Sequence, residues 1–385
     1  MHALKARILA YAREVGFDIV GVTDATPFLH TERIFSRRVA AGYLSQWHYG
    51  HDDVRRRCTP TASLDGAKSI VCTATSYLND TRPHDPYASG LRGAVSRHAW
   101  GQDYHRVIRA RLRLVADFIR SAVPGSRCLA CVDTGPLVDR AAAVRAGIGW
   151  FGRNGNVLTR EFGSYVLLGE LITDIYLEPD VPLRKHCGSC QECVVRCPTG
   201  AILADGTIDA RRCISDATQL KGPVPRDLRK AIGNRVWGCD DCQTACPVNA
   251  RKEPAAYNAP HPEFAPLPHV GPSVDLTAML RMTSSQFRRW FGPTSMAWRG
   301  KAVLQRNAAV ALGNSGDRAA VAPLAAALDD RKALVRGHAA WALGELGGEE
   351  ARGALRRLIE READPWVREE TSLALAKTSG ADSAA

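Results

Sequence analysis

The sequence of 385 residues predicts a multidomain α+β protein. Three observations support this fold class. Helical and β-rich segments alternate near the N-terminus, cysteines gather in two runs in the middle, and an Ala-rich segment repeats near the C-terminus. We place an α/β domain at 1–180, a cysteine-rich domain at 181–255, a proline-rich connector with a basic segment at 256–295, and helical repeats at 296–385.

The α/β domain is predicted from local patterns. Apolar residues recur at helical spacing in 4–15, which ends near Gly16, and again in 104–123. Runs rich in β-branched and other apolar residues predict strands, and these lie at 17–22, 69–74, 128–132 and 164–173. The motif from Gly147 to Gly152 matches G-x-G-x-x-G. It follows a helical segment rather than a strand, so we interpret it as a helix exit and loop, not as a nucleotide site.

The two cysteine runs have the spacing of iron–sulfur ligands. The first run is Cys187-x2-Cys190-x2-Cys193-x3-Cys197 followed by proline, the bacterial ferredoxin pattern in which the fourth thiolate reaches a second cluster. The second run, with Cys239, Cys242 and Cys246, lacks its leading cysteine, and Cys213 is the spare thiol nearby. We therefore predict a ferredoxin-like domain with two [4Fe–4S] clusters. One cluster is assigned to Cys187, Cys190, Cys193 and Cys246, and the other to Cys197, Cys213, Cys239 and Cys242.

Two other interpretations of these cysteines are zinc binding and disulfide formation. Zinc ribbons also use paired Cys-x2-Cys, but one tetrahedral ion does not need three cysteines at this spacing. Disulfides require an oxidising compartment. The N-terminus has no long apolar segment of a signal peptide, and no stretch approaches the roughly 20 apolar residues that span a bilayer. We therefore expect a cytoplasmic protein without membrane segments, and a monomer.

The C-terminal segment repeats with a period of about 31 or 32 residues. Ala311-Leu312-Gly313 recurs as Ala342-Leu343-Gly344, and Val335-Arg336 recurs as Val367-Arg368. Such units bury one face only by stacking on their neighbours, so the repeats predict a short HEAT-like α-solenoid. Solenoids of this kind are binding scaffolds more often than catalysts.

The net charge of +11 favours polyanionic partners. Between Arg281 and Arg306 the chain has cations and aromatic rings but no acidic residue. Cations follow phosphates and exposed rings stack on unpaired bases, so this stretch predicts an RNA or DNA contact. The alternative is a solvated basic face in an Arg-rich composition. The candidate contacts are Arg288, Arg289, Arg299 and Lys301.

Asp133 is the candidate acid. It follows the predicted strand 128–132 and precedes a Gly-Pro turn, where carboxylates are also common as turn residues. A general acid here needs burial that raises its pKa, and Trp150 and Phe151 could form the apolar walls. The neighbouring Asp103-Tyr104-His105 begins like a corrinoid signature, but Ile108 stands at its glycine position, so a histidine beneath a cobalt is not supported.

With these residues in view, the chain resembles the epoxyqueuosine reductase family, which completes queuosine synthesis on tRNA. The resemblance runs over almost the whole chain, through both cysteine runs and through the motifs Trp100–His105, Val132–Arg140, Gly147–Asn154, Arg212–Ser215 and Arg336–Gly344. It implies that the first domain binds cobalamin, that Asp133 donates a proton, and that Lys221 approaches tRNA. The residues that it places near the corrinoid are Arg57, Arg97, Asp133, Asn154, Val157, Ser215, Asp240 and Asp241.

The resemblance also implies a reaction. Removing the epoxide oxygen to leave an alkene takes two electrons and two protons. Cobalt(I) would attack the epoxide, Asp133 would protonate the leaving oxygen, and the clusters would pass electrons singly from an external low-potential donor. The basic stretch and the repeats would hold the anticodon stem-loop of tRNA. One alternative is a corrinoid iron–sulfur reductase of a small molecule, similar to reductive dehalogenases. Another is an electron shuttle that docks through its solenoid.

Overall fold

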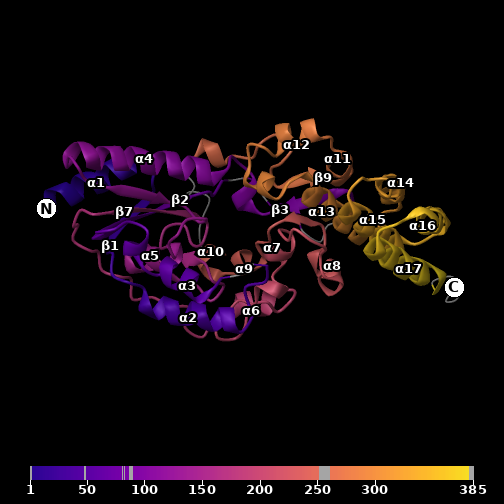
Figure 1. Ribbon diagram of the computed structural model, residues 1–385, viewed down its shortest axis with the longest axis horizontal. Helices are drawn as coiled ribbons and strands as arrows, with labels where there is room; N and C mark the ends of the chain where they lie inside the picture. Colours follow the sequence, from indigo (N-terminus) through magenta and orange to yellow (C-terminus); the bar gives the residue numbers. More distant parts are fainter. Residues whose placement is uncertain are drawn as a thin grey trace. The chain divides into compact units, whose positions relative to one another are not determined.

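The computed structural model describes residues 2–46, 49–79, 81, 83–85, 90–250 and 261–380 (Figure 1). The chain forms two compact units, each built from three segments. The sheet unit consists of Met1–Asp80, Gln102–Arg211 and Asp241–Ala265, and the solenoid unit of Thr81–Gly101, Arg212–Asp240 and Pro266–Ala385. Residues 256–260 of the predicted connector lie outside the described residues.

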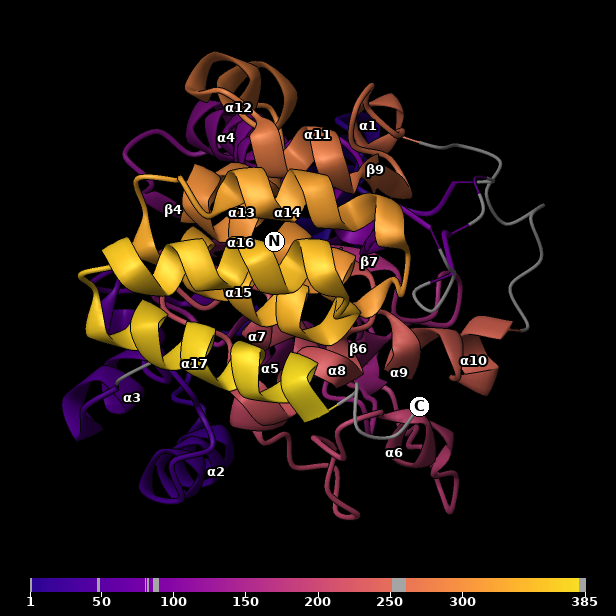
Figure 2. The same cartoon turned by 90° about the vertical axis from the view of Figure 1, so that its right-hand side faces the viewer.

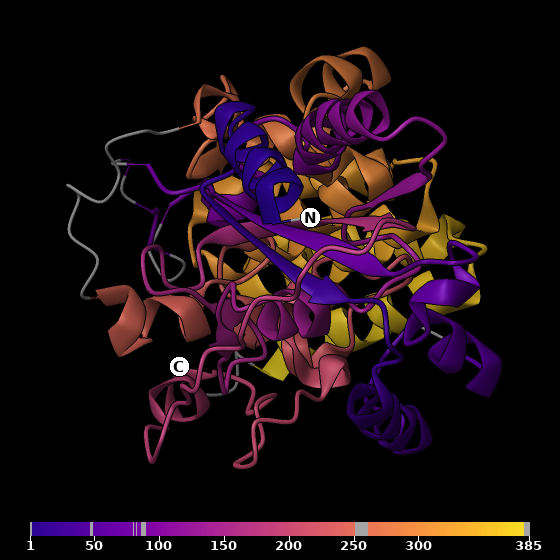
Figure 3. The ribbon, with the colours of Figure 1, turned by 90° about the vertical axis from the view of Figure 1, so that its left-hand side faces the viewer.

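A four-stranded antiparallel sheet is the centre of the sheet unit. Its strands follow the order β1 (Ile19–Asp24), β2 (Ser69–Ser76), β7 (Val166–Thr173) and β4 (Cys128–Cys131). Helices α1 (His2–Glu14) and α4 (Tyr104–Ala122) cover one face, and α5 (Asp139–Arg145) covers the other (Figures 1 and 3). The strands and the two long helices predicted from the sequence are confirmed, with ends that differ by a few residues.

Side chains alternate across the sheet, as the pleat requires. On β7, Leu171 packs with Ile8 and Leu112 beneath the two long helices, whereas Ile172 packs with Ala142 of α5 on the other face. Glu170 shares the face of Ile172. On β7, the α5 face therefore carries this one buried carboxyl group among the apolar side chains of Val166, Leu168 and Ile172.

The rest of the sheet unit consists of short elements around these layers. The predicted helix exit after α5 is confirmed, because the chain turns at Gly147, where φ is 74°, and then forms the hairpin of β5 (Trp150–Phe151) and β6 (Val157–Leu158). The cysteine-rich part of this unit contributes short helices. The remaining elements are α2 (Leu29–Ala40), α3 (His51–Arg57), β5 (Trp150–Phe151), β6 (Val157–Leu158), α6 (Glu192–Arg196), α9 (Asp241–Thr244) and α10 (Pro247–Ala250).

The solenoid unit combines stacked helices with a three-stranded sheet. The sheet has the order β8 (Arg235–Trp237), β3 (Arg92–Val95) and β9 (Ser273–Asp275). The helices include α7 (Ile214–Ala217), α8 (Arg226–Ile232), α11 (Leu276–Arg281), α12 (Ser284–Trp290), α13 (Lys301–Asn314), α14 (Val321–Ala327), α15 (Ala333–Leu346), α16 (Glu349–Arg361) and α17 (Pro365–Gly380). Helix α13 packs on α15, and α15 packs on α17 (Figure 2).

The repeated Ala-Leu-Gly motif brings these helices close together. A Cβ atom added at Gly313 would lie 2.7 Å from the Cα of Ala342, and one added at Gly344 would lie 2.7 Å from the Cβ of Ala374. Each glycine therefore lets the next helix approach its backbone. Residues 212–240, which the sequence placed in the cysteine-rich domain, belong to the same compact unit as these helices. Within the described part of the chain, no helix is long and apolar enough to cross a membrane.

Candidate functional site

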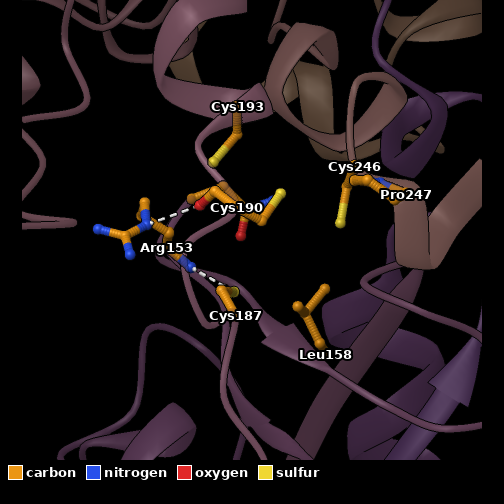
Figure 4. A pocket seen from close by; sticks show the side chains of 8 residues that line it. Arg153, Leu158, Cys187, Cys190, Cys193, Cys246 and Pro247 are labelled. Carbon is orange, nitrogen blue, oxygen red and sulfur yellow. Dashed lines mark hydrogen bonds between the residues drawn. The ribbon is translucent and has the colours of Figure 1, made fainter. Parts of the chain in front are cut away.

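Four cysteines from two distant segments line one cavity in the sheet unit. Cys187 and Cys190 lie before α6, Cys193 lies within it, and Cys246 directly precedes α10. Figure 4 shows their side chains around a common space, which Arg153, Asn154, Leu158 and Pro247 complete. These are the four thiols that the sequence assigned to one cluster, so the structure brings together the predicted set.

The thiols lie close enough to affect each other's ionisation. Burial raises the pKa of Cys193, and the neighbouring Cys187, Cys246 and Cys190 raise it further because four thiolates repel one another. A bound cation removes this repulsion, since metals are held by thiolates. Among the described residues, no three His, Cys, Asp or Glu side chains converge tightly enough to hold a single metal ion.

Arg153 fixes the loop of the first two cysteines. Its backbone N–H lies 3.3 Å from the Sγ of Cys187 and donates to it. Its guanidinium donates to the carbonyl oxygens of Cys190 and Gly188, each at 3.0 Å. Sequence analysis missed this contact, because Arg153 lies more than thirty residues before the cysteines in the chain.

The other four predicted ligands lie at the ends of short elements. Cys197 follows α6 and accepts a hydrogen bond from the backbone N–H of Ala201 at 3.3 Å, and Cys242 is in α9. Cys213 is the N-cap residue of α7, and Cys239 comes two residues after β8. Their assignment to a common cluster stays a prediction.

Asp133 lies just beyond β4 in a left-handed backbone conformation, with φ of 43°. The hydroxyl of Tyr104 donates to its Oδ2 at 2.8 Å, and the Nε2 of His105 lies 3.3 Å from the same oxygen. The other ring nitrogen of His105 contacts the Oδ1 of Asp103 at 2.8 Å. The N-terminus of α4 therefore brings a phenol and an imidazole to the carboxylate, and both imidazole nitrogens face carboxylates.

The expected raised pKa of Asp133 is wrong for this arrangement. Burial acts to raise its pKa, but the hydrogen bonds from His105 and Tyr104 outweigh burial and hold the pKa below its ordinary value. Its side chain is 55% exposed. For His105 burial acts to lower the pKa, yet hydrogen bonds to Asp103 and Asp133 raise it to about 9. Near neutral pH, the proton of this pair is therefore on the imidazole.

Arg57 contacts the loop that carries Asp133. Its Nη1 donates to the carbonyl oxygen of Gly135 at 2.7 Å, and its guanidinium lies 5.1 Å from the ring centroid of Tyr49. The structure thus places Arg57 beside the candidate acid. Trp150, expected as one wall, is buried, whereas Phe151 is 49% exposed.

The remaining candidate cofactor residues fall into both units. In the sheet unit, the Nδ2 of Asn154 donates to the carbonyl oxygen of Cys242 at 3.3 Å, Val157 is buried in β6, and Asp241 begins α9. In the solenoid unit, the Oδ2 of Asp240 accepts from the backbone N–H of Arg97 at 2.8 Å. The carbonyl oxygen of Ser215 accepts from the hydroxyl of Thr218 at 3.0 Å. Their role in binding a corrinoid stays a prediction.

Glu170 is a buried carboxyl group that the sequence analysis missed. It lies in β7 opposite Cys72 of β2 and Cys131 of β4, it is 0% exposed, and neither side-chain oxygen has a hydrogen-bond partner among the described residues. Burial raises its pKa well above the ordinary value, and the charges of Asp139 and Asp133 add to this. Burial therefore favours the neutral, protonated form of Glu170. A glutamate within an apolar strand is the only sequence signal that could have revealed it.

We expect Glu170→Gln to gain stability over the native chain as pH rises from about 5 to 8. The folded pKa is raised, so the stability linked to Glu170 is fully present below the unfolded pKa and is lost at higher pH, by about 1.4 kcal/mol per pH unit. Glutamine has no such loss. Anaerobic denaturant unfolding at several pH values measures the difference, with the exposed Glu161→Gln as control. A difference that does not change with pH would show that Glu170 ionises in the folded state.

The basic stretch divides into exposed and buried residues. Arg288 and Arg289 are exposed on α12, and Lys221 is exposed before α8. Lys301 is partly buried, and its Nζ donates to the carbonyl oxygen of Met282 at 3.4 Å. Arg299 is also partly buried and lies 3.6 Å from the ring centroid of Trp298, whose side chain is 51% exposed.

Two further members of this stretch belong to the interior. Arg306 is 0% exposed and Phe291 is 1% exposed. Arg306 and Phe291 therefore cannot contact a nucleic acid at the surface, and the contacts predicted at Arg288, Arg289, Arg299 and Lys301 stay predictions. Periodicity alone could not reveal this, because an arginine in a predicted helix is ordinarily exposed.

Family models match three parts of the chain. The model of a 4Fe-4S double cluster binding domain matches residues 186–249, the model of epoxyqueuosine reductase QueG, DUF1730, matches 57–134, and the model of HEAT repeats matches 299–376. The first and third matches lie within the segments predicted as the two-cluster domain and as the HEAT-like repeats. The iron–sulfur interpretation of the cysteines is thereby supported over zinc ribbons and disulfides.

Known proteins resemble the chain over nearly its full length. The epoxyqueuosine reductase of Bacillus anthracis is 39% identical over 374 residues, which is 97% of each chain. A crystal structure of epoxyqueuosine reductase with an epoxyqueuosine-modified tRNA stem loop has a TM-score of 0.91 and 39% identity, and covers 98% of this chain and 99% of that one. A structure of the Bacillus subtilis enzyme, with its catalytic aspartate loop swung out of the active site, has a TM-score of 0.90 and 38% identity, with 97% and 99% coverage.

Proposed function

This chain belongs to the epoxyqueuosine reductase family, and we propose that it reduces epoxyqueuosine to queuosine at the wobble position of tRNA. The observation that carries the proposal is the sheet unit itself. It holds a four-thiol cavity together with a carboxylate that has a phenol and an imidazole as partners. A cluster held by these thiols would transfer electrons, and Asp133 together with His105 would transfer protons. A reductive removal of oxygen needs both.

The residues present fit the expected cofactors. Cys187, Cys190, Cys193 and Cys246 would hold one [4Fe–4S] cluster, since their thiols line one cavity and repel one another without a metal. A corrinoid has an apolar ring edged with amides, and the sheet unit offers the exposed ring of Phe151 and the polar groups of Arg57 and Asn154. When bound, cobalamin would supply a two-electron nucleophile for the epoxide carbon, and the clusters would supply single electrons to it.

The Asp133–His105 pair would supply the proton. Breaking the epoxide C–O bond leaves negative charge on oxygen, and a positioned acid neutralises that charge. His105 carries a proton near neutral pH and contacts the Oδ2 of Asp133, so it can pass this proton through Asp133 to the leaving oxygen. The exposed, left-handed position of Asp133 suits a loop that moves, as the loop of the Bacillus subtilis enzyme does.

The tRNA substrate would be bound through exposed cations. A relative was solved with an epoxyqueuosine-modified tRNA stem loop, and this chain carries a net charge of +11. The exposed Arg288, Arg289 and Lys221 are the strongest candidates for phosphate contacts, since Arg299 and Lys301 are partly buried. An unpaired wobble base in the anticodon loop can be turned into a protein pocket.

We expect charge reversal at Arg288 and Arg289 to weaken stem-loop binding about 10- to 100-fold at low salt, with a smaller effect at high salt. Each lost phosphate contact also lowers the slope of log affinity against log salt by nearly one. Filter binding or fluorescence anisotropy over a salt series measures both. Arg356 and Arg357, exposed neighbours on α16, provide a control with the same change of charge. Equal losses in the two variants would mean that only the net charge matters.

A cellular assay tests the proposed function. The chain is expressed in a bacterium that lacks its own epoxyqueuosine reductase, and the nucleosides of its tRNA are analysed by mass spectrometry. We expect epoxyqueuosine to disappear and queuosine to appear. Persistence of epoxyqueuosine, with the protein present and its clusters intact, would contradict the proposal.

A further inference from the structure

Arg306 on α13 is a fully buried arginine surrounded by backbone carbonyl groups. Its Nη1 donates to the carbonyl oxygens of Leu220 at 2.6 Å and Gly222 at 2.7 Å. Its Nη2 donates to those of Ala217 at 3.2 Å and Thr218 at 2.9 Å. Its Nε and Nη2 also donate to the Oδ1 of Asn307, at 2.9 and 2.6 Å. One guanidinium thus binds the backbone of a six-residue segment.

Among the described residues, this guanidinium donates only to carbonyl and amide oxygens and to no carboxylate. Burial lowers its pKa to about 9, and the nearby cations Arg299 and Arg229 add to the effect, yet the group stays charged near neutral pH. A buried charge without a counter-ion is stabilised only when polar groups replace the lost water. Four backbone carbonyl oxygens and an amide oxygen do this here, so the charge and the segment depend on each other.

The bound segment carries one residue of the proposed function and is joined to another through helix α7. The carbonyl groups of Leu220 and Gly222 flank Lys221, and Lys221 is exposed. Ala217 ends helix α7, and Cys213 is the N-cap residue of that helix. The guanidinium therefore fixes the backbone on both sides of the proposed RNA contact and at the far end of the helix that begins at a proposed cluster ligand.

The neighbouring Asn307 extends the same anchor to a second segment. Its Nδ2 donates to the carbonyl oxygens of Thr218 at 2.8 Å and Val236 at 2.7 Å. Val236 is in β8, which leads directly to Cys239. The backbone N–H of Gly238 donates to the hydroxyl of Thr218 at 3.0 Å, so the two segments are also joined to each other.

Other buried groups of the stacked helices hold the same part of the chain. The backbone N–H of Val224 donates to the Nε2 of His338 at 3.1 Å. Asn314 donates to the carbonyl oxygens of Arg229 and Gly233, and Glu370 accepts from the guanidinium of Arg229 at 2.8 Å. These polar side chains of the repeats therefore bind residues 217–236 of their own chain rather than an outside partner.

We propose that Arg306 is a positioning residue, which fixes in one framework the RNA contact Lys221 and the chain segments that bear the cluster ligands Cys213 and Cys239. This inference rests on the proposed function and adds to it. By this inference, helix α13 supports both the proposed cluster ligands and the proposed RNA contact. Loss of the guanidinium should therefore disturb RNA binding and cluster binding together, although Arg306 itself touches neither RNA nor iron.

A double-mutant cycle on stem-loop affinity tests the RNA part. Lys221→Ala alone is expected to weaken binding about three- to tenfold. In an Arg306→Lys background, which keeps the charge but loses most of the hydrogen bonds, the same substitution should have almost no further effect because Lys221 is no longer held in place. Additive effects of the two substitutions would overturn this part of the proposal.

Iron content tests the cluster part. Arg306→Lys is expected to lower iron from about eight atoms per chain towards about four. Arg336→Lys is the matched control, since Arg336 pairs with Glu362 within the same stack of helices and does not touch residues 217–222. Full iron content in Arg306→Lys, or an equal loss in the control, would overturn the proposal.

Two further measurements keep the test decisive. If Arg306→Lys does not fold, Asn307→Ser removes the second anchor more mildly, and hydrogen exchange of residues 213–222 should accelerate in it while exchange in α17 stays unchanged. Unchanged exchange in 213–222 would count against the anchoring role of Arg306 and Asn307.

A native chain that holds no iron or does not bind the stem loop would instead contradict the proposed function. Failure of the positioning role and failure of the proposed function are therefore distinguishable.

Discussion

Asp133→Asn is expected to lower turnover about 10²- to 10⁴-fold, while iron content and stem-loop affinity stay at the native level. Asparagine keeps the size of the side chain and can still accept the hydrogen bond from Tyr104. Its amide is too weak a base to take the proton of His105 and pass it on to the leaving oxygen. Single-turnover conversion of epoxyqueuosine in a modified stem loop, under anaerobic conditions and with excess reductant, measures the loss.

Asp174→Asn is the control for this substitution. Asp174 is a carboxylate at the end of β7 that pairs with Arg127, and it has no part in the proposed chemistry. We expect its variant to turn over at the native rate. Native activity in Asp133→Asn would remove Asp133 from the reaction, and lost iron in that variant would mean that its effect is structural.

Cys246→Ala is expected to halve the iron content, from about eight atoms per chain to about four, and to abolish turnover. The reason is the cavity that Cys246 shares with Cys187, Cys190 and Cys193. The variant should lose the same electron paramagnetic resonance signal as Cys190→Ala. The double variant should lose no more iron than either single variant, because all these thiols would hold one cluster.

Cys58→Ala separates cluster loss from general damage. Cys58 is a thiol of the apolar core on the α5 face of the sheet, and burial raises its pKa to about 11. We expect this variant to keep all its iron. If Cys246→Ala and Cys190→Ala removed different signals, the crossed assignment of the two cysteine runs would be wrong.

Sequence spacing predicted the parts of the molecule that depend on local pattern. Alternation and apolar runs located β2, β7, α4 and the stacked helices, because side-chain periodicity follows directly from backbone geometry. The sequence also predicted that Cys246 joins the first cysteine run, since in two-cluster ferredoxins the last cysteine of each run binds the other cluster. The recurrence of the Ala-Leu-Gly motif predicted the repeats, whereas the close approach of the helices at its glycines was found only in the structure.

The sequence could not predict properties that depend on distant contacts. The pKa of Asp133 depends on the partners that α4 brings to it, and burial alone suggested the opposite direction. Arg306 looked like part of a basic surface, but the segment 217–222 covers it. For Glu170 the single signal was a glutamate within an apolar strand, which does not show that its carboxyl group lacks partners. Arg153 gave no signal, because it acts on cysteines far along the chain.

The most direct test of the account is conversion of an epoxyqueuosine-modified tRNA stem loop by the anaerobically purified chain, reconstituted with iron, sulfide and cobalamin and supplied with a strong reductant. We predict one queuosine formed for each epoxyqueuosine consumed, two electrons used per conversion, and no product when cobalamin is omitted. Full conversion without cobalamin, or no conversion by a chain that carries both clusters and cobalamin, would contradict the account.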